Sequence, residues 1–181
     1  MRTYAFALPS VAKPDPDFRN HRMVAIRSLR VAAPFDGRSL VYRMGEYDFE
    51  SDPYAEFFVS ASESLLIPIR SCLRQAGAFE AVVEPGSART PNMTAEISVP
   101  ELYGDFRRPR DAAALLTLRI LLFDSPNGVP AKLILEREYS RRIPLKARNP
   151  EVLIAGWNEA LAQILAQFDS DVRALPPVPA P

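Results

Sequence analysis

The sequence contains one cysteine, Cys72, and one histidine, His21, in 181 residues. A lone cysteine excludes a disulfide within the chain and a cysteine metal cluster. The sequence also shows no conventional catalytic triad, no Cys–His pair at recognisable spacing, no His/Cys zinc site and no glycine-rich phosphate loop. We therefore expect no metal and no cofactor, and a protein that binds partners rather than an enzyme. Cys72 falls on the apolar side of a predicted helix, where a small buried side chain is expected.

Two acidic pairs are the strongest remaining source of catalytic chemistry. Glu46 and Asp48 alternate on one predicted strand, and Glu136 and Glu138 alternate on another. Carboxylates in such positions are more often solvated or paired with arginine than catalytic. Hydrolysis by carboxylates alone stays open as an alternative.

No apolar run approaches the roughly 20 residues that a membrane-spanning helix needs. No signal peptide is recognisable either, because Met1 leads directly into strand-like residues. Composition therefore leaves two locations open: the cytoplasm, or export under a signal that lies upstream. The formal net charge is zero, from 22 basic and 22 acidic residues. No overall field draws such a chain to nucleic acid, and no nucleic-acid partner is expected.

Glycine is also scarce, with 7 residues, whereas proline is abundant, with 18. Prolines gather between residues 9 and 16 and between residues 176 and 181, which is typical of loose, extended segments. The length suits one domain with a sizeable core. We expect a single domain over residues 1–175 and a proline-rich tail over residues 176–181.

Alternating apolar residues bounded by turn residues predict a series of strands. In chain order these are Thr3–Leu8, Met23–Ala33, Leu40–Met44, Tyr47–Phe49, Phe79–Val83, Asn92–Tyr103, Ala112–Phe123 and Ala131–Ile143. Gly45 and the turn cluster 124–128 favour hairpins between their neighbouring strands.

Capping residues signal two helices. Ser60 and Glu63 form a capping box for the first helix, and Gly77 supplies its stop. Pro68 lies inside this helix and is expected to kink or restart it. Asn149, followed by proline, begins the second helix. The apolar stripes are Leu65, Leu66, Ile69, Cys72, Leu73 and Ala76 in the first helix, and Leu153, Trp157, Leu161, Ile164, Leu165, Phe168 and Val172 in the second.

The last two long strands can be paired as a hairpin with Leu121 opposite Ile134. Arg119 then faces Glu136, and each strand sorts into one apolar and one polar face. Arg137 falls on the apolar face, where a place at the sheet edge would let its guanidinium reach water. We therefore predict an α+β fold: a largely antiparallel β-sheet with two amphipathic helices packed on one face.

Three apolar residues cluster on the polar face near the tip of this hairpin: Leu121, Phe123 and Ile134. They are either scattered surface residues or a patch that meets a partner.

A basic rim is predicted at the opposite end of the sheet. Its members are Arg107, Arg108, Arg110, Arg141 and Arg142, with Lys146 and Arg148 just beyond. The rim is either solvated and paired with nearby acids, or a surface for phosphate headgroups or an acidic partner.

Two stretches of the chain point to a family. Residues 35–63 read FDGRSLVYRMGEYDFESDPYAEFFVSASE, and residues 101–106 read ELYGDF. In these stretches, and in the order of its elements up to the last helix, the sequence resembles the ABC-type transport auxiliary lipoprotein component family. Members similar to the paraquat-inducible C lipoprotein accompany MCE-type (mammalian cell entry) lipid transporters.

The resemblance implies a non-catalytic periplasmic accessory lipoprotein that acts by docking to other proteins of a system that moves lipids or other hydrophobic solutes. Its partners would be an MCE substrate-binding protein and the permease and ATPase of the transporter, and self-association is a further expectation. The resemblance also implies an export signal and a lipidated cysteine upstream of Arg2, which would anchor the protein to a membrane. An alternative is a small carrier that holds a lipid or other hydrophobic ligand between helices and sheet.

Overall fold

The computed structural model describes residues 1–8 and 21–176. The first proline-rich stretch and residues 177–181 of the expected tail lie outside them. In chain order the elements are β1 (Arg2–Tyr4), β2 (Met23–Val31), the 3-10 turn η1 (Ala33–Phe35), β3 (Ser39–Arg43), β4 (Phe49–Phe57), α1 (Ala61–Ala76), β5 (Ala81–Val82), β6 (Met93–Asp105), β7 (Ala113–Asp124), the 3-10 turn η2 (Pro126–Gly128), β8 (Lys132–Pro144) and α2 (Pro150–Arg173).

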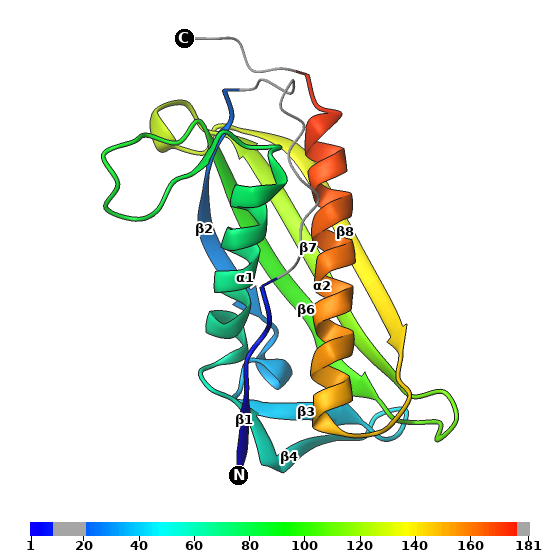
Figure 1. The fold of residues 1–181 in the computed structure, drawn as a ribbon. Helices are drawn as coiled ribbons and strands as arrows, with labels where there is room; N and C mark the ends of the chain where they lie inside the picture. The colour runs from blue at the N-terminus through cyan, green and yellow to red at the C-terminus, as the bar shows by residue number, and fades with distance from the viewer. Residues whose placement is uncertain (9–20, 177–181) are drawn as a thin grey trace.

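The strands form one mixed sheet with β6 at its centre. One side of β6 pairs parallel with β2 along its first half and with β3 at its last two residues. The other side pairs antiparallel with β7, which pairs antiparallel with β8. Both helices lie on the same side of this sheet (Figure 1). The predicted α+β fold class is confirmed, whereas the parallel pairs of β6 were not foreseen.

Strand β4 is the largest difference from the predicted elements. The expected hairpin strand ended at Phe49, but β4 begins there and continues to Phe57. It contains Pro53, three acidic residues and a serine, which made it resemble a loop. Strand β1 pairs parallel with the second half of β4, between Arg2 and Ala55 at one end and Tyr4 and Phe57 at the other.

The predicted register of the last hairpin is wrong by two residues. Leu121 lies opposite Glu136, not Ile134, and Arg119 lies opposite Glu138. Because side chains alternate with period two, a shift of two leaves the residues of the regular ladder, such as Leu121 and Arg119, on their predicted faces. A bulge between Leu122 and Phe123 then skips one residue of β8.

The capping residues act as predicted. The Ser60 hydroxyl accepts a hydrogen bond from the Glu63 backbone at 3.3 Å, and the Glu63 carboxylate accepts one from the Ser60 backbone. Gly77 ends α1 with a φ of 86°, in the left-handed region that glycine adopts without strain. Helix α1 is continuous through Pro68, whose ring is buried, so the helix does not restart there. Asn149 caps α2 through its side-chain oxygen.

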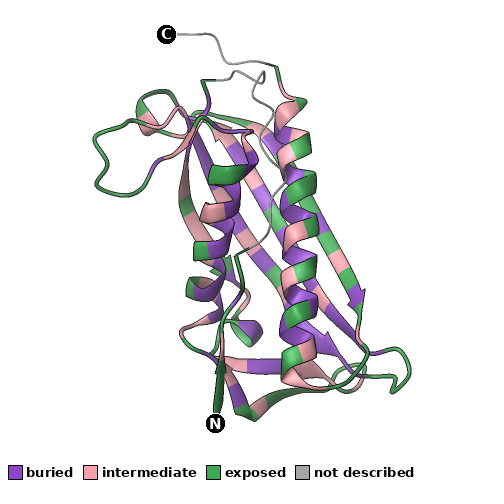
Figure 2. Ribbon diagram, viewed as in Figure 1, coloured by how far each residue is buried: buried purple, intermediate pink, exposed green. Residues whose placement is uncertain are grey.

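The core lies between the helices and the sheet. Helix α2 covers β7 and β8, and α1 covers the β2 side. The helix faces that are turned to the sheet are buried (Figure 2), including every predicted residue of the α2 stripe. Cys72 is buried as predicted, and burial raises the pKa of its thiol to about 11. No helix in the described ranges has the length and apolar character to cross a membrane.

The N-terminal residues tie the sheet edge to α2. The Arg2 guanidinium and the Tyr4 hydroxyl both reach the Glu151 carboxylate, at 2.7 and 2.9 Å. The Phe6 ring is buried and stacks on Phe57 at 5.4 Å and on Trp157 at 6.3 Å. Figure 1 shows this segment crossing in front of the sheet between the helices.

Candidate functional site

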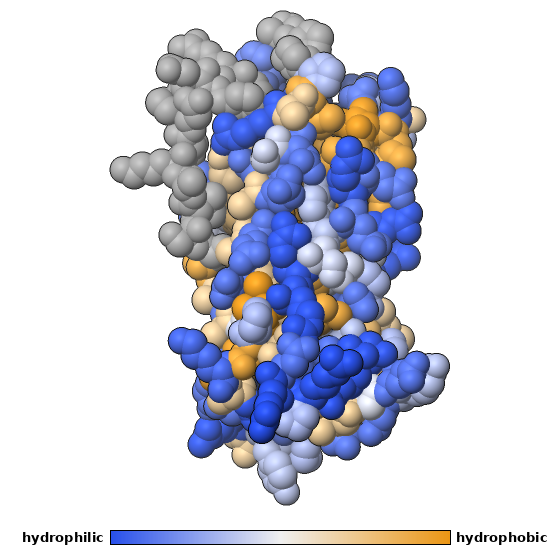
Figure 3. All heavy atoms as spheres, turned by 90° about the vertical axis from the view of Figure 1, so that its right-hand side faces the viewer, coloured by the Kyte–Doolittle hydropathy of each residue, from blue (hydrophilic) through white to orange (hydrophobic). Residues whose placement is uncertain are grey.

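The face of the sheet that the helices leave uncovered carries an apolar group at one end. Leu121 and Phe123 of β7 are half-buried on this face. Leu133 of β8 lies opposite Phe123 and is 42% exposed. We call these three residues the hairpin patch. Figure 3 views the β8 edge and shows hydrophobic residues gathered near the top, where β7 and β8 meet in their hairpin.

Ile134 was expected in this patch but does not belong to it. It is the residue that the bulge skips, and its side chain packs against the core. Leu133 takes its place on the surface, because the bulge reverses the alternation at this point of β8. The bulge has no signature in the sequence, so this exchange could not be predicted.

A polar hollow adjoins the hairpin patch. It has a volume of about 380 Å³ and shares Leu121 with the patch. Its other lining residues are Arg27, Ser28, Arg30, Glu96, Ile97 and Ser98. Arg27 pairs with Glu96 at 3.2 Å. An apolar centre bordered by charged and hydroxyl groups has the composition of a protein–protein interface.

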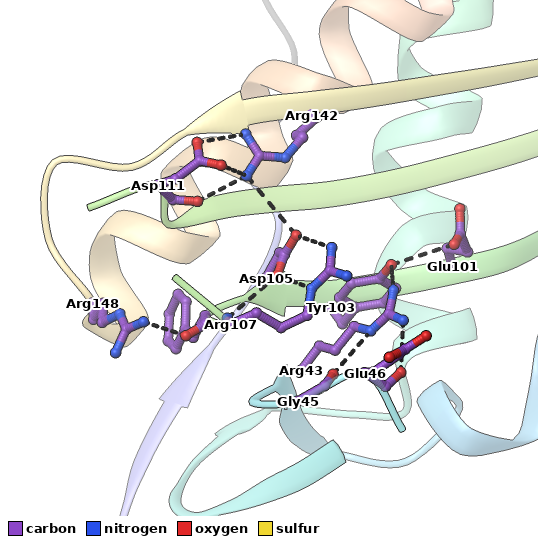
Figure 4. A network of polar contacts seen from close by, with 11 residues as sticks. Arg43, Gly45, Glu46, Glu101, Tyr103, Asp105, Arg107, Asp111, Arg142 and Arg148 are labelled. Carbon is purple, nitrogen blue, oxygen red and sulfur yellow. Dashed lines mark hydrogen bonds and ion pairs between the residues drawn. The ribbon is translucent and has the colours of Figure 1, made fainter. Parts of the chain in front are cut away.

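The predicted basic rim is organised around an acid that the prediction missed, Asp105. Its side chain is 8% exposed. Arg107 donates to both carboxylate oxygens, at 2.9 and 2.8 Å, and Arg142 lies 3.9 Å away. Arg142 also pairs with Asp111 at 3.0 Å. Figure 4 shows the carboxylate of Asp105 between the two guanidiniums.

This network neutralises part of the rim. The hydrogen bonds from Arg107, with the charge of Arg142, hold the pKa of Asp105 below its usual range. Next to it, Arg43 donates to the Tyr103 hydroxyl, and the burial of Tyr103 raises the pKa of that phenol. Asp105 stands two residues before the arginine cluster in the sequence, and that proximity was the available signal.

The remaining rim residues do not form one surface. Arg108 lines a hollow of about 490 Å³ with Arg107 and Arg142, and Arg110 is exposed. Arg141 lies opposite the buried Leu116, so it faces the helix side of the sheet at its edge. The rim is therefore split between the two faces.

Replacing Asp105 with asparagine should remove an acid-sensitive part of the stability. Because the folded-state pKa of Asp105 is depressed, its contribution is complete above about pH 4 and is lost as the pH falls through the folded-state pKa. Urea unfolding at pH 7 should find Asp105→Asn less stable than the wild type, with the difference shrinking toward pH 2. The matched control is Asp111→Asn, which removes an exposed partner of Arg142 and should change stability less at pH 7. Equal curves for wild type and Asp105→Asn would contradict this assignment.

Within residues 1–8 and 21–176 there is no group of three or more His, Cys, Asp or Glu side chains placed to hold a metal ion. The buried carboxylate of Asp105 is occupied by its guanidinium partners. The hairpin patch and its hollow are candidate surfaces for a partner.

Comparison with known proteins finds similarity of structure but not of sequence. No family model matches this chain. No curated protein matches it either. Among solved structures, protein XCC0632 from Xanthomonas campestris, of the family DUF330, superposes with a TM-score of 0.74 over 92% of both chains at 17% identity.

Two further structures are similar at lower identity. The hypothetical protein CT253 from Chlamydia trachomatis matches with a TM-score of 0.57 at 9% identity, over 86% of this chain and 99% of that one. The PelC dodecamer from Paraburkholderia phytofirmans is similar only weakly, at 16% identity with a TM-score of 0.45, over 83% of this chain and 91% of that one. At these identities the first two similarities establish a shared fold.

Proposed function

We propose that this chain is a non-catalytic accessory lipoprotein of an ABC transport system of the MCE type, which moves lipids or other hydrophobic solutes. The fold shared with XCC0632 over 92% of both chains supports this proposal, because DUF330 is the ABC-transport auxiliary lipoprotein family. The stretches at residues 35–63 and 101–106 support it from the sequence side.

The hairpin patch on the uncovered face of the sheet is the observation that supports docking as the mode of action. Sheets that pack on one side usually turn polar side chains to water on the other. Here Leu121, Phe123 and Leu133 interrupt that pattern beside a hollow with Arg27 and Arg30. An apolar centre with arginine at its border is where interfaces concentrate their binding free energy.

The partners in this proposal are the MCE substrate-binding protein and the permease and ATPase. The protein would work in the periplasm, anchored through an N-terminal lipid upstream of Arg2. Self-association through the hairpin patch or the β8 edge is part of the proposal, because β8 pairs with β7 alone among the described strands.

Phe123→Asp should leave folding intact and weaken docking by about thirtyfold, as expected for the loss of about 2 kcal/mol at an interface hot spot. Affinity for the MCE protein and the permease complex can be measured by biolayer interferometry, and self-association by light scattering. Ile67→Asp is the matched control, because Ile67 is 66% exposed on α1, which covers the opposite face of the sheet. Unchanged binding and unchanged scattering for Phe123→Asp would refute the docking role of the patch.

A further inference from the structure

The segment from Glu46 to Phe58, EYDFESDPYAEFF, has a composition found nowhere else in the chain. It contains five acidic and five aromatic residues and no lysine or arginine. The chain as a whole is neutral, so negative charge is concentrated here. The segment covers the β3–β4 turn and β4, at the lower end of the molecule in Figure 1.

The aromatic side chains of this segment are unusually exposed. Tyr47 is 90% exposed, Tyr54 75%, Phe58 70% and Phe49 43%. No other large aromatic residue in the described ranges reaches this class of exposure. Together with the exposed acids that neighbour them along the chain, we call them the acidic aromatic strip: Glu46, Tyr47, Asp48, Phe49, Glu50, Tyr54 and Phe58.

The backbone beneath the strip is held in place. The Asp52 carboxylate accepts hydrogen bonds from the backbone of Tyr54 at 2.7 Å and of Ala55 at 3.0 Å, and from the Tyr42 hydroxyl. In the turn, Arg43 donates to the Glu46 carbonyl at 2.7 Å. A surface that is ordered before binding loses little conformational entropy when a partner arrives.

Three carboxylates of the strip form no ion pair, although Glu46 lines a hollow with Arg107 and Arg108. Among the residues that the structure describes, Glu46, Asp48 and Glu50 form no ion pair through their side chains, whereas Glu56 pairs with Arg38. Tyr47 and Phe49 alternate with these three carboxylates along the chain. A cation that binds there can pair with a carboxylate and also lie on a ring.

One contact between a guanidinium and aromatic rings already exists within the molecule. The Arg43 guanidinium lies 5.5 Å from the centre of the Phe49 ring and 5.9 Å from that of Tyr103. Arginine suits this environment better than lysine, because its planar group stacks on rings while its N–H groups pair with carboxylates.

We propose that the acidic aromatic strip is a docking surface for a basic segment of a protein partner, one that presents arginine side chains. The rings of Tyr47, Tyr54 and Phe58 receive the guanidiniums, and the unpaired carboxylates neutralise them. An anionic lipid surface is disfavoured, because the same carboxylates would repel it. This surface is separate from the hairpin patch, so the proposal does not depend on the transport function.

The test measures fluorescence anisotropy of a labelled peptide of alternating arginine and leucine. The wild-type protein should bind it more tightly than the lysine–leucine peptide, and should not bind a glutamate–leucine peptide. Tyr54→Ser combined with Phe58→Ser leaves the charge unchanged and should weaken binding about five- to thirtyfold. Glu46→Gln with Asp48→Asn and Glu50→Gln should also weaken binding and flatten its dependence on salt.

The control removes exposed apolar side chains elsewhere, by Ile67→Ser combined with Val129→Ser, and should leave peptide binding unchanged. These residues are 66% and 64% exposed. Absence of binding to the arginine peptide, or equal loss in the control, would overturn the proposal. Tighter binding to phosphatidylglycerol vesicles than to the peptide would assign the strip to a membrane instead. Self-association in ultracentrifugation that the strip variants abolish would assign it to a second copy.

Discussion

Trp157→Ala is expected to destabilise the protein by about 3–5 kcal/mol, the range for removing a fully buried large aromatic side chain. Trp157 is 0% exposed, and its ring stacks on Phe57 at 5.9 Å and on Phe6 at 6.3 Å. Its indole N–H donates to the Leu115 carbonyl at 3.0 Å. The substitution therefore leaves a cavity, removes the hydrogen bond to Leu115 and loosens the N-terminal segment. Native stabilities of about 5–15 kcal/mol leave little margin for such a loss.

Urea unfolding followed by circular dichroism measures this effect. Trp157→Phe keeps much of the apolar volume and should lose about 1–3 kcal/mol, for the lost hydrogen bond to Leu115 and the smaller ring. Tyr47→Ala, at a 90% exposed aromatic residue, should change stability by no more than about 0.5 kcal/mol. A loss below about 1 kcal/mol for Trp157→Ala would show that α2 does not pack on the sheet as described.

Gly156→Val is expected to lower the free energy of unfolding by about 3 kcal/mol, at the upper end of the usual range for overpacking. A Cβ atom at Gly156 would lie 2.7 Å from the Ala114 Cβ and 2.8 Å from a methyl of Leu145. The leucine methyl can rotate away, but the alanine Cβ is fixed to the backbone of β7. Valine adds two further methyl groups at this contact, so α2 must move away from the sheet.

The neighbouring position supplies the control for this prediction. Ala155 is exposed on the same turn of α2, and Ala155→Val should cost only about 0.5 kcal/mol of helix propensity. Gly156→Ala is the sharper comparison, because alanine normally stabilises a helix interior by about 1 kcal/mol relative to glycine. Thermal unfolding should show that Gly156→Ala destabilises instead. A rise in Tm for Gly156→Ala would contradict the close contact between α2 and β7.

The parts of the fold that local chemistry determines were predictable. Both helices begin at their predicted caps, Ser60 and Asn149, because a cap residue and its partner lie within one helical turn of each other. The faces of the long strands were also predictable, because alternation needs no knowledge of the neighbour. Even a register that was wrong by two residues kept Leu121 and Arg119 on the correct side.

Features set by distant residues were not predictable. The parallel pairing of β6 with β2 depends on the crossover through α1, which leaves no local pattern. Strand β4 was largely missed because its acids and Pro53 resemble a loop, although pairing with β1 and β3 makes it a strand.

The candidate surfaces were predicted in outline only. Leu121 and Phe123 occupy the open face as expected, whereas a bulge replaced Ile134 with Leu133. The basic rim was read as a set of arginines, and its centre turned out to be Asp105, brought between Arg107 and Arg142 by the pairing of three strands. The sequence gives the sign of each charged side chain, but the partner of each charge depends on the tertiary structure.

The junction of β1 with β4 and α2 has a mechanical consequence. Its hydrogen bonds run across the strand axis, so tension along β1 shears all of them together instead of unzipping them one at a time. Arg2 and Tyr4 pass part of that tension to Glu151 at the start of α2, and Phe6 resists withdrawal from between Phe57 and Trp157. A protein held by its first residues would therefore transmit a pull into its core without losing its outermost strand.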